Sequence, residues 1–231
     1  MSIRSHRQLV IRDAPAVAAR MMSDFAVRTG LVPGLHQCRR YLWTDAFAVC
    51  NFIELYVRTA DQSYGRCATE LIDQVHSLLG QYRKDDVRRG WISGLDDETG
   101  RRHPTVGGLR IGKPLKERDT GEPLDERLEW DRDGQYFHYL TKWMHALCAA
   151  AWLMSDGCRW AVELASAAFD GFARKSQSGE VLGLYWKMST DRSRALVPAT
   201  GPHDGLDGFI TFREIQHTCT NSPANAARRS G

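Results

Sequence analysis

The residues best suited to chemistry lie between positions 125 and 138, where five acidic side chains share a short stretch with aromatic rings, a glycine and a histidine. A pair of carboxylates supplies the acid and the base or nucleophile of glycoside chemistry, and aromatic faces stack on sugar rings. Within this stretch, Glu129 and Asp131 are the candidates for the acid and the base. The alternative is a solvated acidic loop that pairs with Arg127 and Arg132, and both interpretations stay open.

Three aspartates stand at the entrances of apolar segments. Asp45, Asp133 and Asp207 each come just before an aromatic side chain. Each of them can be a helix N-cap that accepts hydrogen bonds from free backbone N–H groups. If the three helices share one rim, however, the carboxylates face a common funnel. We therefore treat Asp45 and Asp207 as candidate rim carboxylates, and His138 as an auxiliary proton carrier.

Further polar and aromatic side chains could bind a ligand at the same rim. His138 and His145 are seven residues apart, which places them on one face of a helix. Each of these residues also has a purely structural interpretation. A tryptophan can fill the core, and a buried histidine is commonly a hydrogen-bonded core residue. Arg110 can neutralise the nearby carboxylates. The candidate substrate-binding residues are Trp43, Trp91, Trp130, Tyr136, His103, Arg110, His145 and His203.

Several kinds of site are not supported. The chain has neither an H-E-x-x-H motif nor closely spaced cysteine and histidine ligands, so we expect no metal. The glycine-rich segment 103–113 lacks both common nucleotide-binding patterns, so we expect no nucleotide cofactor. The acidic run 96–98 lies in a loop rather than on an inner helix, which argues against a terpene-cyclase-like site.

The composition limits the classes of partner. The net charge of +3 is too small to argue for nucleic acid. The longest apolar stretch, 146–154, is far shorter than a bilayer span, so no membrane is expected. The six cysteines form no C-x-x-C pair and no charged-then-apolar leader opens the chain. These features predict reduced thiols and a cytoplasmic protein.

The pattern of apolar residues predicts a mainly helical chain. Two predicted helices are apolar nearly all round and are each followed by a one-sided helix. Residues 83–132 read as a long ordered loop with short strands, 181–188 as β-like, and 219–231 as a disordered tail. The predicted helices cover about 13–28, 44–60, 64–82, 133–154 and 158–174, with a last one from about 206.

The alternation of helix types predicts the architecture. An apolar helix followed by a one-sided helix occurs twice, and a third apolar helix then begins. Buried inner helices paired with half-buried outer helices are what an α/α toroid repeats. The sequence thus predicts an all-α fold: an α/α-hairpin array, or partial toroid, forming one domain over residues 1–218.

The helix entrances carry a family resemblance. At Trp43–Phe47, Glu129–Tyr139 and His203–Gly208 the chain resembles the six-hairpin glycosidase-like proteins. These are α/α toroids that share their architecture with the N-acylglucosamine 2-epimerases and several glycoside hydrolase families. The likeness covers about residues 40–217. It implies a carbohydrate or other polyhydroxylated ligand in the funnel, and it leaves hydrolysis and epimerisation both open.

The number of helices departs from that family. A six-hairpin ring needs about twice the helices expected here. We therefore expect an incomplete ring: a truncated form, a half-array, or a core closed by homo-oligomerisation. The leading hypothesis is an enzyme that acts on a glycosidic bond or a sugar epimer centre. The alternative is a non-catalytic helical scaffold or sugar-binding module.

Overall fold

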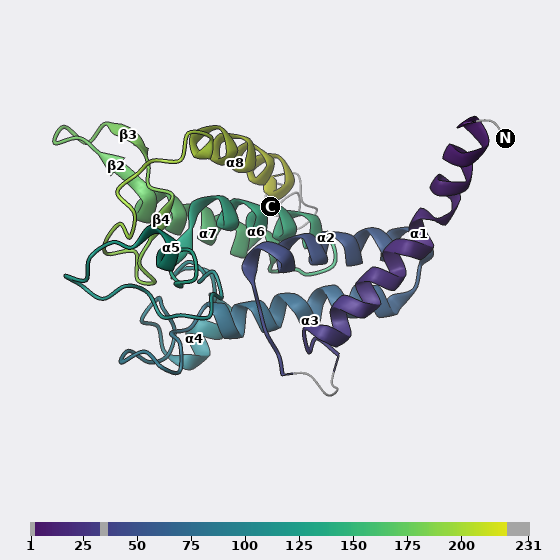
Figure 1. The fold of residues 1–231 in the computed structure, drawn as a ribbon, viewed down its shortest axis with the longest axis horizontal. Coiled ribbons are helices and arrows are strands. Elements are labelled where there is room, and N and C mark those ends of the chain that lie inside the picture. The colour runs from purple at the N-terminus through teal and green to yellow at the C-terminus, as the bar shows by residue number, and fades with distance from the viewer. Residues whose placement is uncertain (1–2, 33–36, 221–231) are drawn as a thin grey trace, which may run out of the picture.

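The chain folds into a helix-rich structure with little β-structure. The computed structural model describes residues 3–32 and 37–220, with side chains for residues 14–32 and 37–219. Two of its helices, α4 and α5, are short (Figure 1). The helices are α1 (Ile3–Arg28), α2 (Leu42–Thr59), α3 (Gln62–Leu79), α4 (Asp97–Arg102), α5 (Glu126–Glu129), α6 (Phe137–Ala150), α7 (Gly157–Phe172) and α8 (Asp204–Thr220).

The strands form two small antiparallel sheets. In one, β1 (Gln135–Tyr136) pairs with β4 (Lys187–Met188), and in the other β2 (Ala173–Lys175) pairs with β3 (Val181–Leu184). Among the described residues no other sheet is present. The expectation of an all-α protein is confirmed at this level.

Two helical hairpins pack side by side through their first helices. The hairpins are α2–α3 and α6–α7, and α2 lies against α6. At the start of these two helices the rings of Tyr41 and Tyr139 meet edge to face, and near their ends the rings of Tyr56 and Trp152 stack. Contacts at both ends show that α2 and α6 run parallel.

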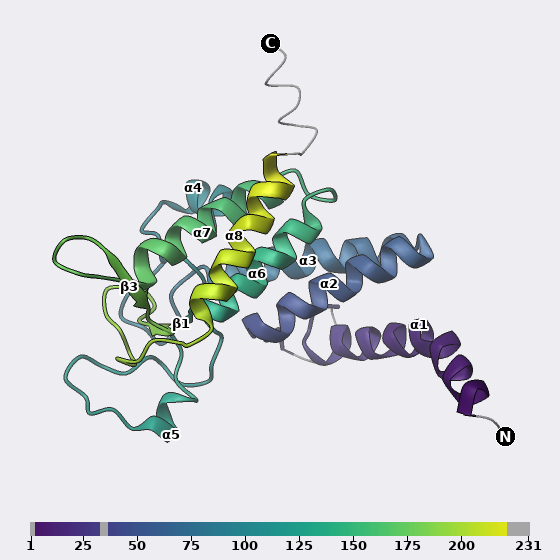
Figure 2. The same ribbon diagram turned by 90° about the horizontal axis from the view of Figure 1, so that it is seen from above.

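The last helix lies along the other side of α6. Near its start Asp207 accepts a hydrogen bond from Thr141, and in its second half Glu214 contacts His145. Helix α8 therefore also runs parallel to α6 (Figure 2). The N-terminal ends of α2, α6 and α8 point the same way, as the hairpin array predicts.

The sequence explains where the central helices begin and what they bury. The Asp45 carboxylate in the first turn of α2 accepts the N–H of Tyr41, the residue that precedes the helix. This bond satisfies one of the free donors at the helix start. On α6 the side chains of Trp143, Met144 and Leu147 are fully buried. Helix α6 is thus buried on most sides, as its nearly all-round apolar pattern predicted, and only His145 in it is exposed.

Several predicted boundaries were wrong. Helix α6 begins at Phe137 rather than 133, because Gln135 and Tyr136 are held as a strand by pairing with β4. Helix α1 begins at Ile3 rather than 13. Helix α8 continues to Thr220, so the predicted tail can begin no earlier than 221. Residues 221–231 lie outside the described part of the chain.

The long segment 83–132 is ordered, as predicted. Its regular structure consists of the short helices α4 and α5, and the strands that were predicted there are not present in these described residues. Its end is tied to the core by Gln135, which is fully buried. The Gln135 amide donates to the carbonyls of Gly107 (3.0 Å) and Thr190 (2.6 Å), while its oxygen accepts the N–H of Leu109 (3.1 Å). One side chain thus joins β1 to two loops, one at 107–109 and one at Thr190. None of the described helices is long and apolar enough to cross a membrane.

A buried histidine joins the two hairpins. His76 of α3 accepts a hydrogen bond from the Trp143 indole of α6 over 3.1 Å, and its ring packs against Trp160 of α7. Burial lowers the pKa of His76 to about 3. The imidazole is therefore neutral in the folded protein and takes up a proton only on unfolding at ordinary acidic pH.

We predict that this histidine makes folding acid-sensitive. Its folded pKa lies below its unfolded value, so stability is complete above about pH 6.5 and falls as the pH drops. Between pH 7 and pH 5, His76→Gln should lose about 2 kcal/mol less unfolding free energy than the native chain. Urea titrations at both pH values measure this, with exposed His217→Gln as the control. Equal losses in all three proteins would contradict the prediction.

Candidate functional site

A continuous row of aromatic rings runs across the N-terminal ends of α2 and α6. Consecutive ring centroids in this row lie 5.0–5.9 Å apart. The row begins on α2, passes the start of α6 and β1, and ends on the residue before β4 and the residue after α5. We call it the aromatic row, and its members in order are Phe47, Trp43, His138, Tyr136, Trp186 and Trp130.

The short sheet β1–β4 positions the centre of the row. Because β1 pairs with β4, Tyr136 and Trp186 stack with their planes 8° apart. Tyr136 is buried, whereas Trp130 at the end of the row is 59% exposed. Phe47 at the other end is also exposed. The row therefore offers flat apolar faces at the surface that are supported by rings in the core.

A pocket of about 400 Å³ adjoins the row at the start of α8. Its wall combines an indole with imidazoles and carboxylates, which is a mixture of apolar and titratable groups typical of ligand sites. We call it the small pocket. Its lining residues are His138, Trp186, Thr200, Gly201, Pro202, His203, Asp204 and Asp207.

The two carboxylates of the small pocket have opposite electrostatic environments. Burial alone would raise the pKa of Asp207, but Lys142 (2.7 Å) and Thr141 (2.8 Å) hydrogen-bond to it and hold its pKa below the ordinary value. Burial, together with the charge of Asp207, raises the pKa of Asp204 to about 6. One oxygen of Asp204, Oδ2, has no hydrogen-bond partner in the described part of the chain. Paired acids with pKa values pushed apart are typical of acid–base sites.

His138 links the row to the small pocket. Its ring stacks on Tyr136 and meets Trp43 edge to face, and it also lines the small pocket. Burial lowers the pKa of His138, with Asp207 acting in the opposite direction. The imidazole is thus mainly neutral near pH 7 and can accept a proton.

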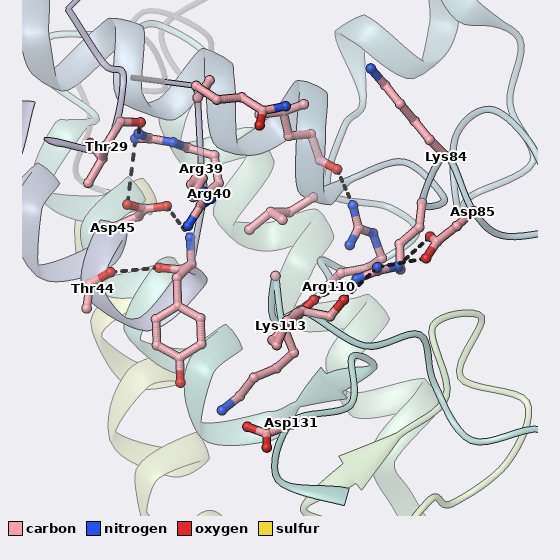
Figure 3. A pocket seen from close by; sticks show the side chains of 18 residues that line it. Thr29, Arg39, Arg40, Thr44, Asp45, Lys84, Asp85, Arg110, Lys113 and Asp131 are labelled. Carbon is pink, nitrogen blue, oxygen red and sulfur yellow. Dashed lines mark hydrogen bonds and ion pairs between the residues drawn. The ribbon is translucent and has the colours of Figure 1, made fainter. Parts of the chain in front are cut away.

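A larger pocket of about 1160 Å³ lies on the other side of Tyr41. It is walled by residues 37–41, the first turn of α2, the end of α3, and the segments 83–85 and 110–114 (Figure 3). Asp45 lies in its wall, where burial raises the pKa of the carboxyl to about 6 although Arg40 lies 3.6 Å away. Asp131 also lines this pocket and is exposed, and Figure 3 shows the Lys113 side chain extending toward it. We call this the large pocket.

Glu129 does not line either pocket. Its buried carboxylate lies 2.8 Å from the Lys187 ammonium and 3.4 Å from Arg118. Lys187 is fully buried and also donates to the backbone carbonyls of Glu129 (2.6 Å) and Arg132 (2.9 Å). Glu129 therefore has a structural role as the counter-ion of Lys187, and it does not face either pocket.

Asp133 and Arg110 neutralise each other inside the protein. The Arg110 guanidinium ion-pairs with Asp133 and donates to the carbonyls of Gln81 (2.7 Å) and Leu78 (2.6 Å). Asp133 also accepts the N–H of Gly112 over 2.9 Å. Asp133 precedes β1 and is not a helix cap. Arg110 forms part of the wall of the large pocket, but each of its three nitrogens already donates a hydrogen bond.

Three predicted binding residues lie away from both pockets and from the aromatic row. Trp91 is buried against Gly100 and donates to Asp97, so it fills the core of the loop. His103 contacts Glu163 of the outer helix α7 at 2.6 Å. His145 lies two turns beyond His138 on α6 and contacts Glu214, and its pKa is raised to about 9 by the Cys50 thiol and by Glu214. The remaining predicted residues are at the rim: Trp43, Trp130, Tyr136 and His138 in the row, and His203 and Asp207 in the small pocket.

Sequence reasoning missed Asp204, Lys142 and Lys187. Asp204 could have been predicted from the sequence, because it precedes Asp207 by three residues and so lies on the same face of the helix. Lys187 interrupts an otherwise apolar β-like segment, which is a signal of a buried ion pair. Lys142 offers no comparable signal, because its partner Asp207 is distant in sequence.

Comparisons with known proteins identify no relative. No protein-family model matches the chain, and neither a curated protein nor a solved structure is similar to it. Within the described residues no group of three or more histidine, cysteine, aspartate or glutamate side chains is arranged to hold a metal ion. What this chain could bind or catalyse is therefore inferred from the aromatic row and the two pockets.

We predict that Glu129→Gln mainly destabilises the protein. The change leaves Lys187 buried without its counter-ion, which typically costs about 3–5 kcal/mol. Glu126→Gln is a matched control, because Glu126 is exposed in the same short helix. Chemical denaturation of both variants measures the difference. A Glu129→Gln protein as stable as the control would show that the ion pair is dispensable.

We also predict that Asp204→Asn stabilises the protein above pH 6. The folded pKa of Asp204 is raised, so its contribution to stability is complete at low pH and is lost as the pH rises from about 4 to 6. At pH 7.5 the variant should gain up to about 3 kcal/mol, and at pH 4 the difference should vanish. Thermal unfolding at the two pH values measures this, with exposed Asp170→Asn as control. A stabilisation independent of pH would contradict the assignment.

Proposed function

We propose that this chain is a carbohydrate-active protein whose site is the small pocket and the adjoining aromatic row. The observation that carries the proposal is the pair Asp204 and Asp207, which share the small pocket with His138 and have pKa values displaced in opposite directions. A carboxylic acid and a carboxylate in one pocket supply general acid and general base.

The row supplies the binding surface for this chemistry. Exposed Trp130 and stacked Trp186 offer flat faces to the apolar side of a sugar ring. In our proposal Asp204 donates a proton, Asp207 acts as the charged partner, and His138 carries protons between them and solvent. The reaction is at a glycosidic bond or a sugar epimer centre. The parallel helices α2, α6 and α8 are consistent with part of an α/α toroid whose funnel opens at this rim.

A second candidate is a sugar-binding module without catalysis. The contacts of Asp207 favour it, because Lys142 and Thr141 already occupy both oxygens of this carboxylate. A carboxylate that is fully paired can orient a ligand hydroxyl without exchanging a proton. The two candidates share the binding surface and differ only in turnover.

We predict turnover that depends on Asp204 in its protonated form. On a panel of oligosaccharides and reducing sugars, Asp204→Asn and Asp207→Asn should each lower kcat by about 100-fold or more. The native rate should fall as the pH rises through about 6, because Asp204 then loses its proton. Trp186→Ala should raise KM, and Asp170→Asn on α7 is the matched control. Product analysis by chromatography measures all four variants.

Three results would decide between the assignments. Loss of turnover in Asp131→Asn but not in Asp204→Asn would move the acid to the large pocket. Saturable binding without turnover, weakened in Trp186→Ala, would support the sugar-binding module. Neither binding nor turnover on the panel would overturn the proposal.

A further inference from the structure

The large pocket has a charge balance that the proposed function does not use. Three arginines that line it are each paired with a carboxylate: Arg83 with Asp85, Arg110 with Asp133, and Arg40 with Asp45. The first two pairs are tight, with Arg83 donating to both oxygens of Asp85 at 2.7 and 2.9 Å. These groups cancel in charge.

The other ionic groups that line the pocket have no ion-pair partner in the described part of the chain to neutralise their charge. The side chains of Arg39 and Lys84 have no hydrogen bond or ion pair with any described residue, and Lys113 only lies over the Tyr41 ring at 5.3 Å. The remaining carboxylate is Asp131, which likewise has no described partner. Three cations against one carboxylate leave a net charge of about +2 in the pocket.

A buried arginine in the same wall lacks acceptors. The side chain of Arg40 is fully buried and donates from Nη2 to the Thr29 carbonyl at 2.5 Å. Its Nε and Nη1 have no hydrogen-bond partner among the described residues, although Asp45 lies 3.6 Å from Nη1. A buried donor without an acceptor destabilises the fold, because it has lost its hydrogen bonds to water. A bound anion would remove this cost, so the arginine is an independent indication of a ligand.

We infer that the large pocket binds a small molecule that carries a phosphate monoester. Such a group bears a charge of about −1.5 to −2 near neutral pH, which matches the excess positive charge, and its oxygens accept hydrogen bonds from guanidinium and ammonium groups. A carboxylate carries only one charge and would leave the pocket positive. The volume of about 1160 Å³ accommodates a small metabolite. Figure 3 shows the cationic side chains on several sides of the cavity.

This site is separate from the small pocket. Tyr41 and Tyr139, whose hydroxyl oxygens lie 2.5 Å apart, stand between the large pocket and His138. The two pockets share no lining residue, so the inference does not depend on the proposed carbohydrate chemistry.

Isothermal titration calorimetry tests the inference on the full chain. The ligands are glucose 6-phosphate, glucose and glucuronate, which differ in charge while sharing a sugar ring. We expect saturable binding of glucose 6-phosphate, at least about tenfold weaker in Lys113→Gln and in Arg39→Gln. Arg66→Gln is the matched control, because Arg66 is exposed on α3 outside the pocket.

Three outcomes would overturn the inference. They are no saturable binding of glucose 6-phosphate, equal weakening in Arg66→Gln, or glucuronate binding as tightly as the phosphate ester. Circular dichroism of each variant shows whether it is folded. Because Arg39 and Lys113 are not fully buried, substitution by glutamine leaves no buried charge unpaired.

Discussion

The N-terminal ends of α2, α6 and α8, where both pockets lie, are held in place by a buried carboxylate whose charge is paired. Asp133 has no exposed surface, and an isolated carboxylate is too costly to bury. Arg110 and the N–H of Gly112 satisfy it, and Arg110 also binds carbonyls at the end of α3. Through this pair the segment before α6 is fastened to the loop 107–113 and to the first hairpin. The positions of β1, of Tyr136 and hence of the aromatic row all follow.

A second buried pair fixes the other edge of the rim. Lys187 on β4 holds Glu129 and the carbonyl of Arg132, and its ammonium lies over the Tyr136 ring. Burial would favour the neutral form of Lys187 and lowers its pKa, so the nearby carboxylate is what keeps the charge in place. Buried ion pairs of this kind contribute little net stability, but they specify which segments come together. Here they place Trp186 against Tyr136.

With these groups committed to structure, the carboxylates that remain for chemistry are few. Asp204 and Asp207 share the small pocket, while Asp45 and Asp131 line the large one. The two pockets differ in character: one is mixed and aromatic, the other is rich in cations. This division supports a carbohydrate proposal for the first and an anion-binding inference for the second, and it separates them by the Tyr41–Tyr139 contact.

The sequence by itself determined the order of helices, their all-round or one-sided apolarity, and the aromatic and acidic residues at their entrances. These features are local, because helical periodicity and capping involve neighbours within a few positions. The tertiary structure alone decided which acids are free. Glu129 meets Lys187 and Asp207 meets Lys142 across 58 and 65 residues of chain. No local pattern encodes such a partner, because the pairing arises only when α6, β4 and α8 pack together.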